Sequence, residues 1–157
     1  MGEKERMRRI TVRALAVLAF AVSSISISTN VLAQEWPFVE GDFWEVTGIS
    51  IEDGGGLTYA NWLATEWRKN LDFAKSKGWI KDYMILSNVY GRADEADLYL
   101  IRVLESVPSG AEGEQRRKEY MEWQSKSLSD MQKESGNRAE YREVLSSSLL
   151  QHMKFRD

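Results

Sequence analysis

Apolar and polar residues alternate in several short stretches of the chain, and such alternation is typical of β-strands. The segment 43–51 (FWEVTGISI) shows the pattern first, and 80–90 repeats it. The segment 97–104 (DLYLIRVL) is nearly continuous in apolar residues, which favours a central strand that is buried on both faces. A fourth strand is predicted at 149–155, and the three glycines at 54–56 end the first one.

Two longer segments carry apolar residues at helical spacing. The first runs from a capping Thr58 to Lys77, and its apolar face consists of Tyr59, Leu63, Trp67, Leu71 and Ala74. The second is predicted at about 114–132, and a short helix is predicted at about 138–145. The elements therefore follow the order β-α-β-β-α-β.

This order predicts an α+β fold of the ferredoxin-like type. Right-handed crossovers place both helices on one face of a four-stranded antiparallel sheet. The other face then lacks a helical cover. It is expected to be either solvated or paired with the sheet of a second copy.

The N-terminal segment 1–33 has the pattern of a secretory signal peptide. Five basic residues against two acidic ones precede an apolar run at 14–22, and small residues stand at the expected positions before a cleavage site after Ala33. The apolar run is too short to span a bilayer, so no stable membrane span is expected after cleavage. An uncleaved anchor or a buried helix is the alternative. Residues 34–41 are predicted to form an extended arm, and 42–157 a single domain.

Composition narrows the chemistry that this domain can perform. The full chain carries 21 basic and 24 acidic residues. Removal of five basic and two acidic residues with the signal peptide gives the remaining chain a net charge of −6, which excludes nucleic-acid binding by counterion release. The absence of Cys excludes disulfides and thiolate metal sites, and a single His excludes a histidine cluster. We expect no metal, no cofactor and a periplasmic or secreted location in a bacterium.

The element order and the aromatic segments give the chain a resemblance to a known superfamily. The segments that carry it are FWEV at 43–46, the helix at 59–77, DLYL at 97–100 and the closing strand. The chain resembles the dimeric α/β-barrel proteins, which include the antibiotic-monooxygenase-like and NIPSNAP-like domains, and also small exported bacterial proteins of unassigned function. The resemblance implies a homodimer with its sheets face to face and a cavity between helices and sheet. Haem-degrading members use an Asn, a Trp and a His ligand, but the only His here, His152, stands on the last strand, so no catalytic residue is carried over.

The first helix carries the most informative polar residues. Glu66 and Asn70 fall between its apolar face and a flanking pair of aromatic residues, Trp62 and Phe73. A partly desolvated carboxylate between aromatic rings is suited to proton transfer or to anchoring a ligand. The alternative is a surface Glu whose stem crosses a hydrophobic edge.

Three further residues are candidates for a site. Glu45 and Arg102 are polar residues in otherwise apolar rows of the first and third strands. If the rows face the same way, the two residues form a buried ion pair or line a polar cavity; otherwise they are separate edge residues. His152 is a weak catalytic candidate because a His titrates near neutral pH, and its alternative is a surface or structural role.

These features predict an exported homodimeric binding or structural protein with a cavity for a small, largely apolar molecule. The alternative is a cofactor-free oxygenase or isomerase in which Glu66 or His152 acts as acid and base. An enclosed carboxylate favours chemistry, and a solvated one favours binding. A protein-interaction subunit is favoured if Trp36, Phe38 and Trp123 form one exposed patch.

Overall fold

A computed structural model of the protein describes residues 35–157, so the predicted signal peptide at 1–33 lies outside the described residues. Residues Trp36–Asp157 form one compact α+β unit. In chain order its elements are β1 (Phe38–Ile51), α1 (Gly56–Trp62), the π-helical segment η1 (Leu63–Trp67), α2 (Arg68–Ser76), β2 (Asp82–Ser87), β3 (Leu98–Leu104), α3 (Gly110–Gln124), α4 (Leu128–Asn137), the 3-10 turn η2 (Arg138–Glu140) and β4 (Arg142–Phe155).

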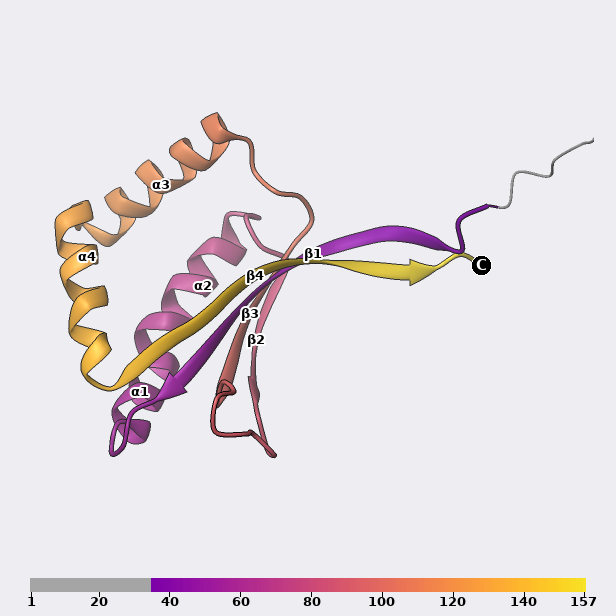
Figure 1. The fold of residues 1–157 in the computed structure, drawn as a ribbon. Helices are drawn as coiled ribbons and strands as arrows, with labels where there is room; N and C mark the ends of the chain where they lie inside the picture. Colours follow the sequence, from indigo (N-terminus) through magenta and orange to yellow (C-terminus); the bar gives the residue numbers. More distant parts are fainter. Residues whose placement is uncertain (1–34) are drawn as a thin grey trace, which may run out of the picture. The chain divides into compact units, whose positions relative to one another are not determined.

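The four strands form one antiparallel sheet in the order β2-β3-β1-β4. This arrangement is consistent with the predicted ferredoxin-like fold, and β3 is a central strand as its apolar run predicted. The helices of this unit lie on one face of the sheet (Figure 1). Residues that face them on β1 alternate from Phe43 to Ile51 and pair with the row from Leu98 to Leu104 on β3.

Two core clusters join the first helical segment to the sheet. One contains Ile49, Tyr59, Leu63 and Leu100, and the other contains Leu71, Ile80 and Leu104. Tyr59, Leu63 and Leu71 come from the predicted apolar face of the helix, and the other two residues of that face, Trp67 and Ala74, pack against the clusters. The predicted role of this face is therefore confirmed.

The π-helical segment follows from the spacing of these core residues. Residues four apart on an α-helix are offset by about 40°, so the apolar row from Tyr59 to Leu71 would turn steadily away from the sheet. A π-helical turn takes in one more residue than an α-helical turn and reverses this drift. It falls at Leu63–Trp67, in the middle of the row, and keeps both ends of the helix against the sheet.

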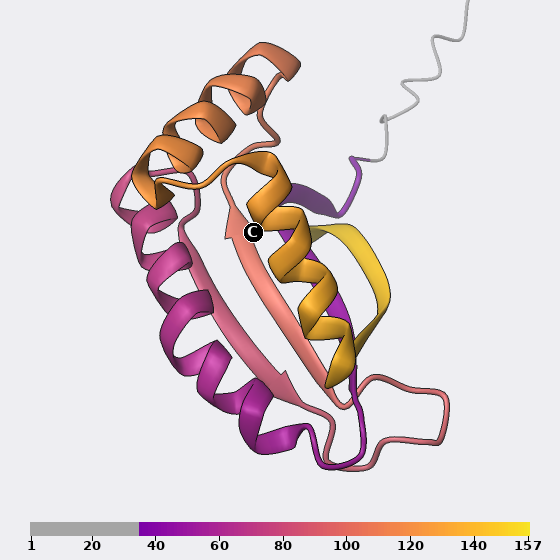
Figure 2. The ribbon, with the colours of Figure 1, turned by 90° about the vertical axis from the view of Figure 1, so that its left-hand side faces the viewer.

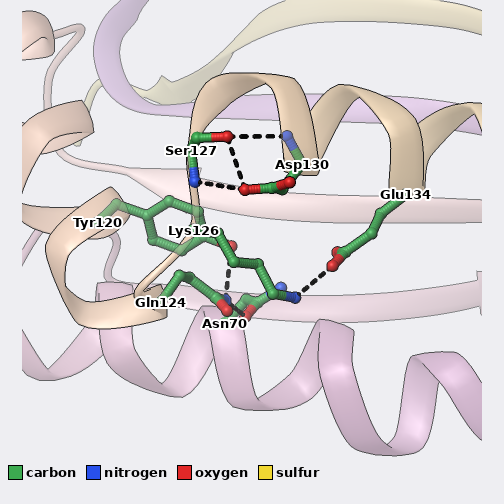
Figure 3. A network of polar contacts seen from close by, with 7 residues as sticks. All are labelled: Asn70, Tyr120, Gln124, Lys126, Ser127, Asp130 and Glu134. Atoms are coloured by element: carbon green, nitrogen blue, oxygen red, sulfur yellow. Dashed lines mark hydrogen bonds and ion pairs between the residues drawn. The ribbon is translucent and has the colours of Figure 1, made fainter.

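The second predicted helix, 114–132, is wrong in one respect, because two helices occupy this region. Ser125 adopts a left-handed conformation with φ of 54° and ends α3. Ser127 then caps α4: its hydroxyl accepts from the Asp130 backbone N–H, and the Asp130 carboxylate accepts from the Ser127 backbone N–H (Figure 3). This reciprocal cap satisfies the donors of a new helix start and explains the break.

The predicted short helix at 138–145 is also wrong. Only η2 is helical there, and β4 begins at Arg142, seven residues earlier than predicted.

The predicted extended arm is also partly wrong. β1 begins at Phe38, so residues 38–41 of that arm belong to a strand. The two strands pair from Ile51 opposite Arg142 to Phe38 opposite Phe155, with irregularities between Glu40 and Phe43 and between Gly48 and Ile49. They extend beyond β3 as a two-stranded ribbon (Figure 1). Backbone hydrogen bonds between the two strands determine where they begin and end, and these bonds do not depend on alternation of apolar and polar side chains.

Candidate functional site

A cavity of about 700 Å³ lies between the helices and the sheet. We call it the helix–sheet cavity. In the view onto the helical side, α2 (magenta) and the α3–α4 segment (orange) border the strands behind them (Figure 2). The walls of the helix–sheet cavity are mainly apolar, and its volume is that of a site for a small organic molecule. The apolar lining residues are Leu71, Ala74, Trp79, Ile80, Leu104, Val107, Pro108 and Leu149.

An ion pair lies on the sheet side of this cavity. Glu45 and Arg102 are direct cross-strand partners on β1 and β3, and Arg102 Nη2 donates to Glu45 Oε1. Their side chains are 31% and 43% exposed, so the pair is partly buried. Of the two sequence alternatives, the one in which both rows face the same way is confirmed, but the pair is more exposed than predicted. Because Arg102 has five N–H donors, it keeps others for a bound group.

The α3 side of the cavity adds two more arginines. Arg116 donates to the backbone carbonyl of Trp79 at 3.2 Å, lies over the Trp79 ring and pairs with Glu112. Arg117 forms an ion pair with Glu114 on the same helix, with 3.8 Å between Arg117 Nη2 and Glu114 Oε1. The cavity lining thus contains three arginines, and each has an acidic partner: Glu45, Glu112 or Glu114. Because a guanidinium has five N–H donors, each arginine keeps donors for an anionic group on a ligand.

A second cavity, of about 520 Å³, lies between the helix formed by α1, η1 and α2 and the α4 segment. We call it the helix–helix cavity. Asn70 and Tyr120 line both cavities, and Gln124 Nε2 donates to Asn70 Oδ1 and, at 3.1 Å, to Tyr120 Oη (Figure 3). This bridge separates the two cavities. Burial raises the pKa of Tyr120, which keeps its hydroxyl protonated at neutral pH.

The predicted site residues are divided between these cavities. Trp62, Glu66 and Asn70 line the helix–helix cavity, in which Lys126 is paired with Glu134 at 2.7 Å. Their spacing of four residues, which spans the π-helical segment, puts them on one side of the helix. Glu45 and Arg102 line the other cavity, and Asn70 is common to both.

Two predicted residues lie elsewhere. Phe73 stacks on Trp123 with ring centroids 4.1 Å apart and planes at 9°, and lines neither of the two cavities. His152 is exposed on β4, with its ring 6.1 Å from that of Trp44, on the sheet face away from the helices. The structure therefore does not bring His152 and Glu66 together as an acid–base pair.

The aromatic patch considered for protein interaction is not formed as predicted. At the end of the β1–β4 ribbon, the ring of Phe38 contacts that of Trp36 at a centroid separation of 5.7 Å and that of Phe155 at 5.2 Å. Trp123 is instead held against α2 by its stack with Phe73. The three aromatic residues do not share one surface.

Sequence reasoning missed Arg116 and Arg138. Arg116 stands on the charged side of a helix, Arg138 comes directly after the last residue of α4, and nothing local indicates a binding role for either. The one usable signal was Ser127 followed three residues later by Asp130, which marks the start of α4 and hence a change in helix direction.

Comparison of the chain with family models, curated proteins and solved structures found no match. Within residues 35–157, no helix has the length and apolar character that crossing a membrane requires. The same residues contain no group of three or more His, Asp or Glu side chains able to hold a metal ion.

Proposed function

We propose that the protein binds a small amphipathic molecule, with a largely apolar body and one anionic group, in the helix–sheet cavity. The observation that carries the proposal is a cavity of about 700 Å³ with apolar walls and a cross-strand Glu45–Arg102 pair on its sheet side. Apolar walls provide affinity through desolvation, and a few fixed polar groups orient the ligand. Export to the periplasm, as the N-terminal pattern predicts, is part of this proposal.

The N–H donors of the lining support an anionic group on the ligand. Glu45 neutralises part of the positive charge of Arg102, while Arg116 is held in place by the Trp79 carbonyl and ring. A carboxylate that enters here meets donors whose positions are already fixed, which lowers the entropic cost of binding.

Decanoate tests this proposal because it combines an apolar chain with a carboxylate. We expect the full chain to bind decanoate about tenfold or more tightly than decanol, measured by calorimetric titration. Arg102→Met should remove this preference, and Glu45→Gln/Arg102→Met should do so without leaving an unpaired carboxylate. Arg92→Met is the matched control, because Arg92 is an exposed arginine outside the cavity lining. Equal binding of the two probes by the unmodified protein, or no saturable binding of decanoate, would contradict the proposal.

We further propose that two copies pair through the sheet face that the helices leave uncovered, as in the dimeric α/β barrels that the chain resembles. This outer face is defined by Trp44, Val46, Met84, Leu86, Tyr99 and Leu150. The cross-strand rows through Val46 and Gly48 carry no charged side chain, so a suitable partner surface is itself apolar. A second copy offers such a surface, and a two-fold axis makes the contact self-complementary.

A matched pair of Leu→Lys variants tests the dimer. Leu86 is 48% exposed on the outer face, whereas Leu57 is 76% exposed on α1, on the helical side of the sheet. In sedimentation at micromolar concentration, Leu86→Lys should shift the protein from dimer to monomer, because it places two buried charges at the interface, and Leu57→Lys should remain dimeric. A monomeric unmodified protein would overturn this part of the proposal.

A further inference from the structure

Two arginines near the helix–helix cavity lack an acidic partner among the described residues. They are Arg138 in η2 and Arg142 at the start of β4. Neither takes part in an ion pair within residues 35–157, and the Nε atom of each is buried without a hydrogen-bond partner. Buried polar atoms are nearly always satisfied in folded proteins, so two such atoms on neighbouring cations indicate a missing partner.

The orientation of Arg138 is fixed by an aromatic ring. Its guanidinium carbon lies 4.5 Å from the centroid of Trp62, and Trp62 in turn stacks on the buried Tyr59 at 5.7 Å with planes at 6°. A guanidinium that is stacked by its face keeps its N–H donors at the edge of the plane. Arg138 lines the helix–helix cavity, so its charge borders a space large enough for a small ligand.

The surroundings of Arg138 disfavour its positive charge. Burial, followed by the positive charge of Arg142, lowers the pKa of Arg138. The acidic residues that line the same cavity offset this effect only in part: Glu134 raises the pKa of Arg138 but forms its ion pair with Lys126, and Glu66 forms no ion pair with either arginine. The two guanidinium groups therefore repel each other, and although Arg142 does not line the cavity, an anion bound to Arg138 there would offset this repulsion.

We propose that the helix–helix cavity is an oxyanion site, in which Arg138 binds a carboxylate or phosphate group and Arg142 contributes a second positive charge. The planar fork of a guanidinium matches the geometry of both groups. The ring of Trp62 on the face of Arg138 provides the rigid support that a bidentate contact requires. The site is separate from the one proposed for the amphipathic ligand, because the Asn70–Gln124–Tyr120 bridge lies between the two cavities.

Calorimetric titration of the full chain with inorganic phosphate and with acetate tests the site. We expect saturable binding of at least one of the two anions, and about tenfold weaker binding by Arg138→Gln and by Arg142→Gln. Binding of phosphate alone would assign a phosphate group to the ligand, binding of acetate alone a carboxylate, and binding of both an oxyanion of either kind. Arg92→Gln removes the same charge from an exposed position and should leave the affinity unchanged.

One further variant and the decanoate titration keep the result interpretable. Arg138→Lys retains the charge but loses the planar fork, so it should fold and still bind more weakly than the unmodified protein. Saturable binding of decanoate without binding of phosphate or acetate would be a failure of this site alone, and binding of phosphate without any preference for decanoate over decanol would be a failure of the decanoate site alone. No saturable binding of either anion, or an equal loss in Arg138→Gln and Arg92→Gln, would overturn the proposal.

Discussion

Replacing Tyr59 by alanine is expected to lower the free energy of unfolding by about 3–5 kcal/mol, as for large aromatic residues in other cores. The side chain is 1% exposed and is the largest fully buried one among the described residues. It packs against Ile49 and Leu63 in the first core cluster, and its ring also contacts that of Tyr141, 6.0 Å away beside β4. Its removal leaves a cavity where the helix meets both β1 and the start of β4. Urea denaturation followed by circular dichroism measures the change.

Two controls separate this effect from a general sensitivity of the helix. Tyr59→Phe keeps the ring and should change the free energy of unfolding by less than about 1.5 kcal/mol. Leu57→Ala removes an apolar side chain from the same helix at an exposed position and should change it by less than about 0.5 kcal/mol. A loss below about 1 kcal/mol in Tyr59→Ala would show that this cluster is not the main core.

Gly55→Ala is expected to lower the free energy of unfolding by about 1–3 kcal/mol through overpacking. A Cβ atom at Gly55 would lie 2.5 Å from the carbonyl oxygen of Tyr141 and 2.8 Å from its Cβ atom. It would also lie 3.0 Å from the carbonyl oxygen of Glu52. Backbone hydrogen bonds hold both neighbours, from Glu52 N to Tyr141 O and from Gly55 N to Glu52 O, so no flexible side chain can move aside. Thermal unfolding monitored by circular dichroism gives the difference in stability.

The adjacent glycine is the matched control. A Cβ atom at Gly56 meets nothing within 4 Å, and Gly56 is the first residue of α1. Because alanine is the better helix former by about 1 kcal/mol, Gly56→Ala should leave stability unchanged or raise it slightly. If both variants lost the same stability, the close approach of Tyr141 to Gly55 would not be the cause.

Hydrophobic spacing identified those parts of the fold that bury apolar surface. The four-residue repeat from Tyr59 to Leu71 predicted the helix and its core face, because each of those side chains packs against the sheet or beside it. The parity of the strands placed Glu45 and Arg102 in rows that face the same way, and the register then made them direct partners. Sequence alone left their pairing open because a shift of one residue would have separated them.

The same reasoning failed where burial is slight. Neither α3 nor α4 contains a buried residue, so the apolar pattern at 114–132 contained no information on where one helix ends. β4 pairs with one neighbour only, and most of its residues are exposed, so backbone hydrogen bonds rather than side-chain alternation determine its fourteen residues.

The candidate site was predicted in part for the same reason. Trp62, Glu66 and Asn70 share one helix face, which spacing reveals, and they line one cavity. Arg138 reaches that cavity from a segment 76 residues beyond Trp62, and its position depends on the turn between α3 and α4. No local pattern encodes such a contact, so the arginine at the centre of the oxyanion proposal is visible only in three dimensions.

The absence of buried residues in α3 and α4 has a consequence for motion. Both core clusters consist of residues outside these two helices, so the helical segment 110–137 can detach by local unfolding while the sheet and the first helix remain intact. The stack of Phe73 on Trp123 and the hydrogen bonds of Gln124 are among the contacts that such an opening breaks. Residues of this segment line both cavities, so its local unfolding would admit solvent or ligand to either cavity. A ligand bound in either cavity would in turn stabilise the closed arrangement.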